Sequence, residues 1–318
     1  GSKTTIIRSD EASSNSDYGK PGMFGADLNA SYYTIEQPYT LMYTTASQAS
    51  YIIETAPSVD FSGNEEMRNA YMGEAYFWRA FAHYYLLINF RNISPIRQMP
   101  RNGDDYVRPL EKPAAVWDFI QEDLAHAKEL LPVKGYWDSK NAGRVTKASA
   151  AALLGKAYLY RSGIEQYYGE DKTTFYSEAA KEFGDVIDGK YGTYDLTKNY
   201  ADNFDVAHEN NEESILEFQF LGDVDNAGFN PGLATSGLAF DSRGLMLPGA
   251  GVGYEGVVHN WLYNAFVNSV DKDGYTDIRM FSTMIFNDLD ASIHLRNDAG
   301  GNPVRLEGPG GYKWEELY

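Results

Sequence analysis

The sequence lacks cysteine, long apolar runs and an excess of positive charge. None of its 318 residues is cysteine, so it has neither a disulfide framework nor a thiolate for catalysis. No run of about 18 apolar residues occurs, which predicts that no helix of this chain spans a membrane. The formal net charge is −18, whereas nucleic acid and anionic membrane surfaces require a basic surface on the protein. These absences argue against both partners and are compatible with a neutral ligand.

Motifs for catalysis, metal binding and cofactor binding are also missing or incomplete. The histidines are scattered without zinc-ligand spacing, and no G-x-S-x-G segment occurs. Residues 251–256 match G-x-G-x-x-G, but residues 245–248 before them are too short for the buried strand of a dinucleotide site. Residues 271–277 resemble part of a calcium loop that lacks its final glutamate. We therefore expect no cofactor, no metal and no enzymatic activity, with a glycosidase carboxylate pair as a weaker alternative.

Two segments combine small and aromatic residues at the spacing of an α-helix. Residues 65–89 place Tyr71, Ala75, Trp78 and Ala82 on one face, and residues 145–163 repeat this pattern around Gly155. Small residues let another helix approach closely, and aromatic rings fill the space beside them. Each segment therefore predicts a helix that packs against a partner helix.

The predicted partners lie downstream, at residues 113–132 and 175–188. Gly155, Tyr158, Ala179 and Phe183 resemble the tetratricopeptide consensus, in which two helices form a hairpin. The connecting loops, residues 91–112 and 162–173, are longer than the tight turn of that repeat. Long loops inside a compact domain often carry function.

Four motifs occur in order along the chain. The first comprises Gly73, Glu74, Ala75, Phe77, Arg79, Ala80, Tyr84 and Leu87. The second comprises Arg144, Val145, Thr146, Ala150, Ala151, Leu154, Tyr158, Leu159 and Tyr160. An acidic turn at residues 211–218 and a helix followed by Asp277-x-Arg279 complete the set. In this order they resemble the motifs of the SusD/RagB family, which comprises glycan-binding lipoproteins of the Bacteroidetes outer membrane, and the resemblance covers roughly residues 39–285.

The resemblance implies a mainly α fold of tetratricopeptide-like helical hairpins with a loop-rich lobe that contains a few short strands. We expect one SusD-like domain in residues 1–318, with the helical scaffold at about 39–190 and the lobe and a further helix at about 191–318. Further expectations are helices at residues 39–56 and 257–270 and a strand at residues 214–220. The hairpin scheme leaves both of these helices without a partner, so their apolar faces should repack or be covered by more chain.

The function that the resemblance implies is non-catalytic capture of an oligo- or polysaccharide and its delivery to a SusC-like TonB-dependent transporter. Such a protein is a surface-exposed lipoprotein of the cell outer membrane. The chain has no signal peptide and no lipidation cysteine, and its first residues, Gly-Ser, look like a cloning remnant. We therefore expect a chain without its natural ends, whose only attachment to a membrane is a lipid anchor that this chain lacks.

Candidate ligand-binding residues follow from the chemistry of sugars. A sugar presents C–H faces that stack on aromatic rings and hydroxyl groups that pair with polar side chains. Two irregular stretches have this composition, residues 10–33 and 229–261, and their main candidates are Asp10, Tyr18, Tyr32, Tyr33, Arg243, Tyr254 and Trp261. The tyrosines at helical spacing, such as Tyr84 and Tyr160, are assigned instead to the core or to a partner surface.

The alternative is a protein-interaction scaffold. Tetratricopeptide arrays commonly bind peptides, and in this alternative the helices serve only to clamp the transporter without touching glycan. This alternative requires no exposed aromatic platform. Substitution of the candidate aromatics therefore separates the two functions, because only a glycan binder should then lose carbohydrate retention.

Overall fold

The computed structural model describes residues 12–13, 33–169, 173–204, 206–219 and 257–280. The chain divides into two compact units. One, here called the helical unit, comprises residues 37–196 and 212–219. The other, here called the second unit, draws on residues 1–36, 197–211 and 220–318.

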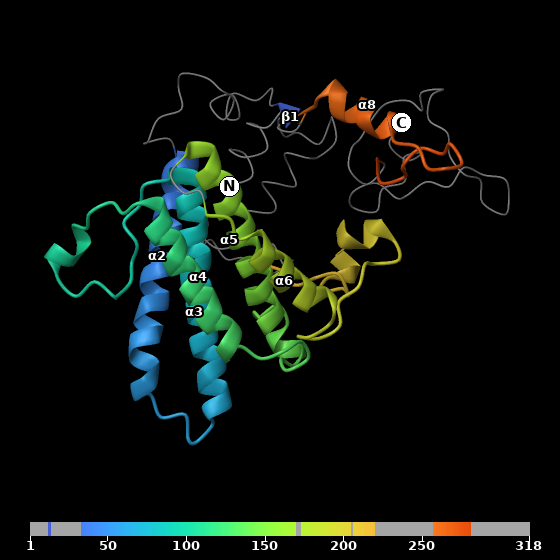
Figure 1. Ribbon diagram of the computed structural model, residues 1–318. Coiled ribbons are helices and arrows are strands. Elements are labelled where there is room, and N and C mark those ends of the chain that lie inside the picture. Colours follow the sequence, from blue (N-terminus) through green and yellow to red (C-terminus); the bar gives the residue numbers. More distant parts are fainter. Residues whose placement is uncertain (1–11, 14–32, 170–172, 205, 220–256, 281–318) are drawn as a thin grey trace. The chain divides into compact units, whose positions relative to one another are not determined.

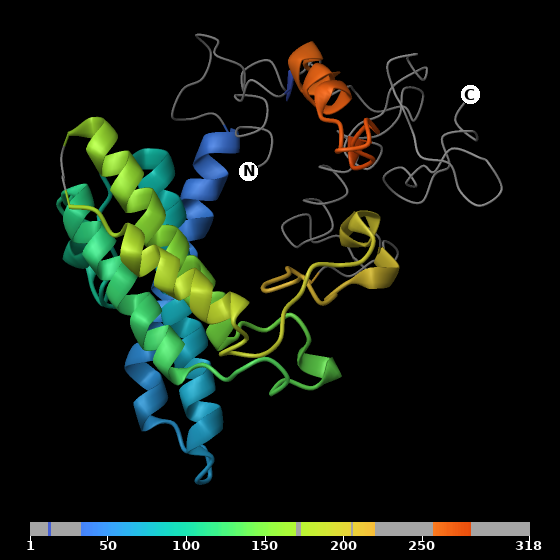
Figure 2. The same cartoon turned by 45° about the vertical axis from the view of Figure 1, so that its right-hand side comes forward.

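Five helices dominate the described part of the chain up to residue 196, which confirms the mainly α prediction. They are α2 (Tyr33–Thr55), α3 (Glu65–Phe90), α4 (Pro113–Leu130), α5 (Lys147–Tyr168) and α6 (Tyr176–Ile187). Helix α3 packs on α4, α4 on α5, and α5 on α6, so successive helices lie side by side (Figures 1 and 2). The two predicted pairs, α3 with α4 and α5 with α6, are both confirmed.

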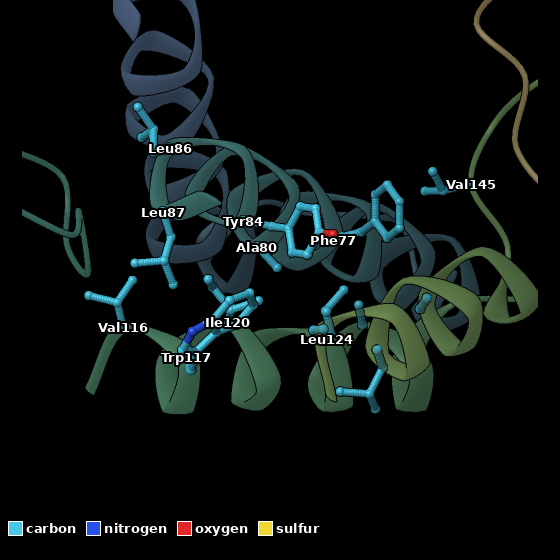
Figure 3. Close-up of a cluster of buried hydrophobic side chains, with 14 of the residues drawn as sticks. Phe77, Ala80, Tyr84, Leu86, Leu87, Val116, Trp117, Ile120, Leu124 and Val145 are labelled. Carbon is cyan, nitrogen blue, oxygen red and sulfur yellow. The ribbon is translucent and has the colours of Figure 1, made fainter. Parts of the chain in front are cut away.

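The main core lies between α3, α4 and α5. Figure 3 shows Phe77 and Tyr84 of α3 among the α4 side chains Trp117, Ile120 and Leu124. All five are buried, and Tyr84 contacts Trp117 edge to face. The assignment of Tyr84 to the core is therefore confirmed.

Two glycines set how closely the paired helices approach. A Cβ on Gly73 would lie 2.9 Å from Leu131 Cγ and 3.0 Å from the Leu131 backbone nitrogen. A Cβ on Gly155 would lie 2.8 Å from the Phe183 ring. Real Cβ atoms do not approach this closely, so each helix pair depends on the missing side chain.

A buried polar network ties the loop after α3 to the helices. Arg79 donates to both carboxylate oxygens of Asp123, at 2.7 and 2.8 Å. His83 Nε2 accepts from the Ile96 backbone N–H at 2.9 Å, so its Nδ1–H donates to the Arg79 carbonyl at 2.7 Å. Burial lowers the pKa of His83 to about 4, so the ring is neutral near pH 7.

Two helices are longer than the sequence predicts. Helix α2 begins at Tyr33 instead of residue 39 and contains Pro38, which removes only one backbone hydrogen bond so near the start. Helix α5 continues past residue 161 to Tyr168 and ends at Gly169, whose φ is +71°. Buried Glu165 pairs with Arg91 and Trp117, and these contacts outweigh the low helix propensity of Gly163.

The predicted strand at residues 214–220 is wrong for the part that the structure describes, residues 214–219. This segment has no strand pairing, bends at Ile215 and Leu216, and packs on the helices through its side chains. Leu216 packs on the main core, and Phe218 contacts the rings of Trp78 and Phe81. The apolar residues of this run therefore pack on helices and not on a neighbouring strand.

The second unit contains strands β1 (Ala12–Ser13) and β2 (Val257–Val258) and helix α8 (Asn260–Asn268). Helix α8 is shorter than the predicted 257–270, because its first residues pair as β2. Two short 3₁₀ turns, Tyr200–Phe204 and Val206–His208, lie between β1 and β2 in the chain. Among the helices that the structure describes, none combines the length and the apolarity needed to cross a bilayer.

Candidate functional site

Five of the seven predicted ligand-binding residues lie outside the described residues, namely Asp10, Tyr18, Tyr32, Arg243 and Tyr254. The same is true of the G-x-G-x-x-G segment at residues 251–256. The other two are placed on helices. Tyr33 is the first residue of α2, and Trp261 is the second residue of α8, where its side chain is 45% exposed.

Strand pairing joins the two predicted ligand-binding stretches. Strands β1 and β2 are antiparallel, with Ala12 opposite Val258 and Ser13 opposite Val257. In the sequence, β1 follows Asp10 by two residues and β2 precedes Trp261 by three. Figure 1 shows β1 beside the start of α8. Segments from opposite ends of the chain therefore meet next to an exposed tryptophan.

The acidic turn after α8 uses its carboxylates internally. Asp271 Oδ1 accepts the backbone N–H groups of Asp273 and Tyr275, at 2.8 and 3.0 Å. Hydrogen bonds from Arg279 lower the pKa of Asp277, which forms an ion pair with that arginine. Within the described ranges, no cluster of His, Asp and Glu has the arrangement of a metal site.

A hollow in the helical unit gathers tyrosines that the sequence analysis did not select. We call it the tyrosine hollow. It has a volume of about 600 Å³ and is lined by Ile88, Asn89, Arg91, Leu159, Tyr160, Gly163, Ile164, Tyr167, Tyr168 and Tyr176. Apart from Arg91, the residue after α3, they come from the end of α3, about the last three turns of α5 and the start of α6. The sequence analysis placed a loop from residue 162 onward and therefore did not assign Ile164 and Tyr168 to the same helix as Tyr160. Their four-residue spacing was the signal that the helix continues.

The polar groups at this hollow are firmly held. Arg91 donates to both oxygens of Glu165, at 2.9 and 3.0 Å, and Trp117 Nε1 donates to the same carboxylate at 2.8 Å. The Arg91 guanidinium also lies 4.2 Å from the centre of the Tyr168 ring. This arrangement neutralises the arginine charge and holds one tyrosine ring in place.

A second hollow lies between α2 and α3 and is here called the α2–α3 groove. It has a volume of about 490 Å³, and its lining includes Ile52, Val59, Phe61 and Trp78. Arg144 lies at one wall, between the rings of Tyr71 and Trp137 at 4.7 and 4.2 Å, and forms an ion pair with Glu74. An apolar groove with one fixed ion pair suits the docking of apolar side chains from another protein.

Comparisons with known proteins agree with the motifs. A family model described as "Starch-binding associating with outer membrane", of the SusD-like type, matches residues 4–159. A SusD-like protein of Bacteroides ovatus is 29% identical over 180 residues, which are 56% of this chain and 32% of the relative. The chain therefore spans about a third of the length of that curated relative.

Solved structures show the same fold. A SusD superfamily protein from Bacteroides vulgatus matches with a TM-score of 0.67 at 23% identity, over 89% of this chain and 55% of that one. A laminarin binding SusD-like protein matches with a TM-score of 0.53 at 25% identity, over 67% of this chain and 45% of that one. The family model and the curated relative, together with the ordered motifs and this fold, support the assignment of the chain to the SusD/RagB family.

Proposed function

We propose that this protein binds an oligo- or polysaccharide without transforming it and passes it to a SusC-like TonB-dependent transporter at the bacterial outer surface. The observation that carries the proposal is the pairing of β1 with β2, which joins the two aromatic-rich stretches beside Trp261. The family description as starch-binding and the laminarin-binding relative support the substrate class. The outer membrane location follows the same description, and a lipid anchor would supply the attachment.

The proposed contacts divide between rings and polar groups. Tyr18, Tyr32, Tyr33, Tyr254 and Trp261 would stack on sugar faces, because an aromatic ring offers a flat apolar surface with low conformational entropy. Asp10 and Arg243 would pair with the hydroxyl groups. Most of the sugar surface stays hydrated, so we expect micromolar or weaker affinity for each site.

Affinity electrophoresis tests this proposal. Native gels are cast with laminarin, starch, xyloglucan or galactomannan, and migration is compared with migration in a gel without polysaccharide. We expect at least one polysaccharide to retard the protein, and Tyr33→Ala with Trp261→Ala to reduce the retardation. Tyr51→Ala is the matched control, because Tyr51 is 51% exposed, close to the 45% of Trp261, and lies on α2 outside both candidate stretches.

The second candidate function is a protein-interaction scaffold that clamps the transporter, which the α2–α3 groove favours. Its apolar lining includes two exposed side chains, Ile52 on α2 and Val59 in the segment that follows α2. In this case Ile52→Asp should weaken binding to a transporter, whereas Tyr33→Ala and Trp261→Ala should leave it unchanged. A folded protein that no polysaccharide retards would favour this candidate over glycan binding.

A further inference from the structure

We propose that the tyrosine hollow is a second carbohydrate-binding site, which takes neutral sugar rings on the helical unit itself. It shares no residue with the surface proposed above, because all its lining residues come from α3, α5, α6 and the residue after α3. Its volume of about 600 Å³ is within the usual range of small-molecule sites, about 300–1,000 Å³.

Exposure of the rings is the first argument. Tyr167 is 84% exposed, Tyr168 56% and Tyr176 48%. Tyrosines at helical spacing usually face a core, as Tyr84 does in this protein. These three rings instead remain accessible around one concave surface, and a tyrosine presents both an apolar face and a hydroxyl group there. That combination matches the C–H faces and the hydroxyl groups of a sugar.

Charge is the second argument. The only cationic side chain that lines the hollow is Arg91, and its guanidinium forms a two-point ion pair with Glu165. The remaining polar lining side chains are the Asn89 amide and the tyrosine hydroxyl groups. The lining of the hollow carries no net charge, and the chain as a whole has a net charge of −18, so an anionic ligand is attracted only weakly. A neutral saccharide is the ligand class that these groups fit.

Preorganisation is the third argument. Arg91 lies over the Tyr168 ring at 4.2 Å, and Tyr167 meets Tyr168 edge to face at 5.1 Å. Arg91 is itself held by Glu165, whose carboxylate also accepts from buried Trp117. The position of the Tyr168 ring is thus coupled to the core of the helical unit. A fixed ring loses less conformational entropy on binding than a mobile one.

The two sites together predict multivalent binding. A long polysaccharide that engages both sites on one chain is retained more strongly than either site alone allows. A short oligosaccharide fills each site independently. Loss of the tyrosine hollow should therefore weaken retention by the polymer without abolishing it.

The test compares the double variant Tyr167→Ala/Tyr176→Ala with Tyr51→Ala in native gels that contain laminarin, starch, xyloglucan or galactomannan. We expect the double variant to raise the apparent dissociation constant at least about fivefold, because aromatic contacts of this kind each change affinity several-fold. Tyr51→Ala should behave as wild type. Tyr167→Phe/Tyr176→Phe keeps the ring faces and should retain most of the retardation. Far-UV circular dichroism verifies that each variant is folded.

The outcomes are distinct. If the double variant migrates like wild type in every gel while Tyr33→Ala/Trp261→Ala loses retardation, the inference is overturned and the proposed function stands. If the tyrosine-hollow variant alone loses retardation, the hollow is the main site and the proposed contacts at Tyr33 and Trp261 are wrong. If none of the four polysaccharides retards the wild-type protein, both proposals are overturned.

Discussion

Gly73→Ala should destabilise the protein although alanine is the better helix former. An added Cβ would lie 2.9 Å from Leu131 Cγ and 3.0 Å from the Leu131 backbone nitrogen. Alanine in a helix interior gains roughly 0.5–1 kcal/mol over glycine. Overpacking costs about 1–3 kcal/mol, and a backbone atom cannot rotate away. We therefore expect a net loss on the order of 1–2 kcal/mol.

Gly184→Ala is the matched control, because the same change occurs in α6 with nothing within 4 Å of the added Cβ. Here only the helix propensity changes, so we expect a gain of roughly 0.5–1 kcal/mol. Urea unfolding followed by far-UV circular dichroism reports mainly on the helices and measures both variants. The midpoint should fall for Gly73→Ala and rise for Gly184→Ala, at an unchanged slope. A Gly73→Ala protein as stable as wild type would refute the close approach of α3 and α4.

Two further predictions concern the buried polar network. Burial lowers the pKa of His83 from 6.5 to about 4. The unfolded chain then binds a proton that the folded chain does not, so stability falls as the pH drops from about 6.5 to about 4, by up to ~3 kcal/mol. Urea midpoints across this range should show that slope, and His83→Gln should remove most of it. Asp123→Ala leaves buried Arg79 without its carboxylate and should cost about 3–5 kcal/mol in urea unfolding. The control is Lys181→Ala, which breaks an exposed ion pair with Asp185 and should lower the free energy of unfolding by less than about 0.5 kcal/mol. Equal losses for Asp123→Ala and Lys181→Ala would contradict the conclusion that burial makes the Arg79–Asp123 pair important.

The sequence predicted the paired helices because their pattern is local. The spacing of small and aromatic residues defines a helix face, and Gly73 and Gly155 mark where a partner can approach. Helix ends were predicted less well. The predicted helix start at residue 39 and the predicted helix end at residue 161 both lie inside helices, since contacts such as Arg91 with Glu165 come from residues far apart in the chain.

The candidate residues on loops were chosen by composition, and for most of them composition is still the only support. The structure adds the pairing of Ala12 and Ser13 with Val258 and Val257, which no local pattern in two-residue strands could indicate. It also shows that the short apolar run at residues 214–219 packs on helices. Strand prediction failed there because a short apolar run indicates burial but not the kind of surface that buries it.

By itself the sequence determined the helical class, the helix pairs and the family, because these depend on residue order and spacing along one segment. Only the tertiary structure decided which tyrosines are available to a ligand. Tyr84 and Tyr160 share one helical spacing pattern, yet Tyr84 is buried against Trp117 while Tyr160 lines the tyrosine hollow. That difference arises because the ends of α3, α5 and α6 leave a concavity where they meet, and a concavity between separate helices has no signature in any one of them.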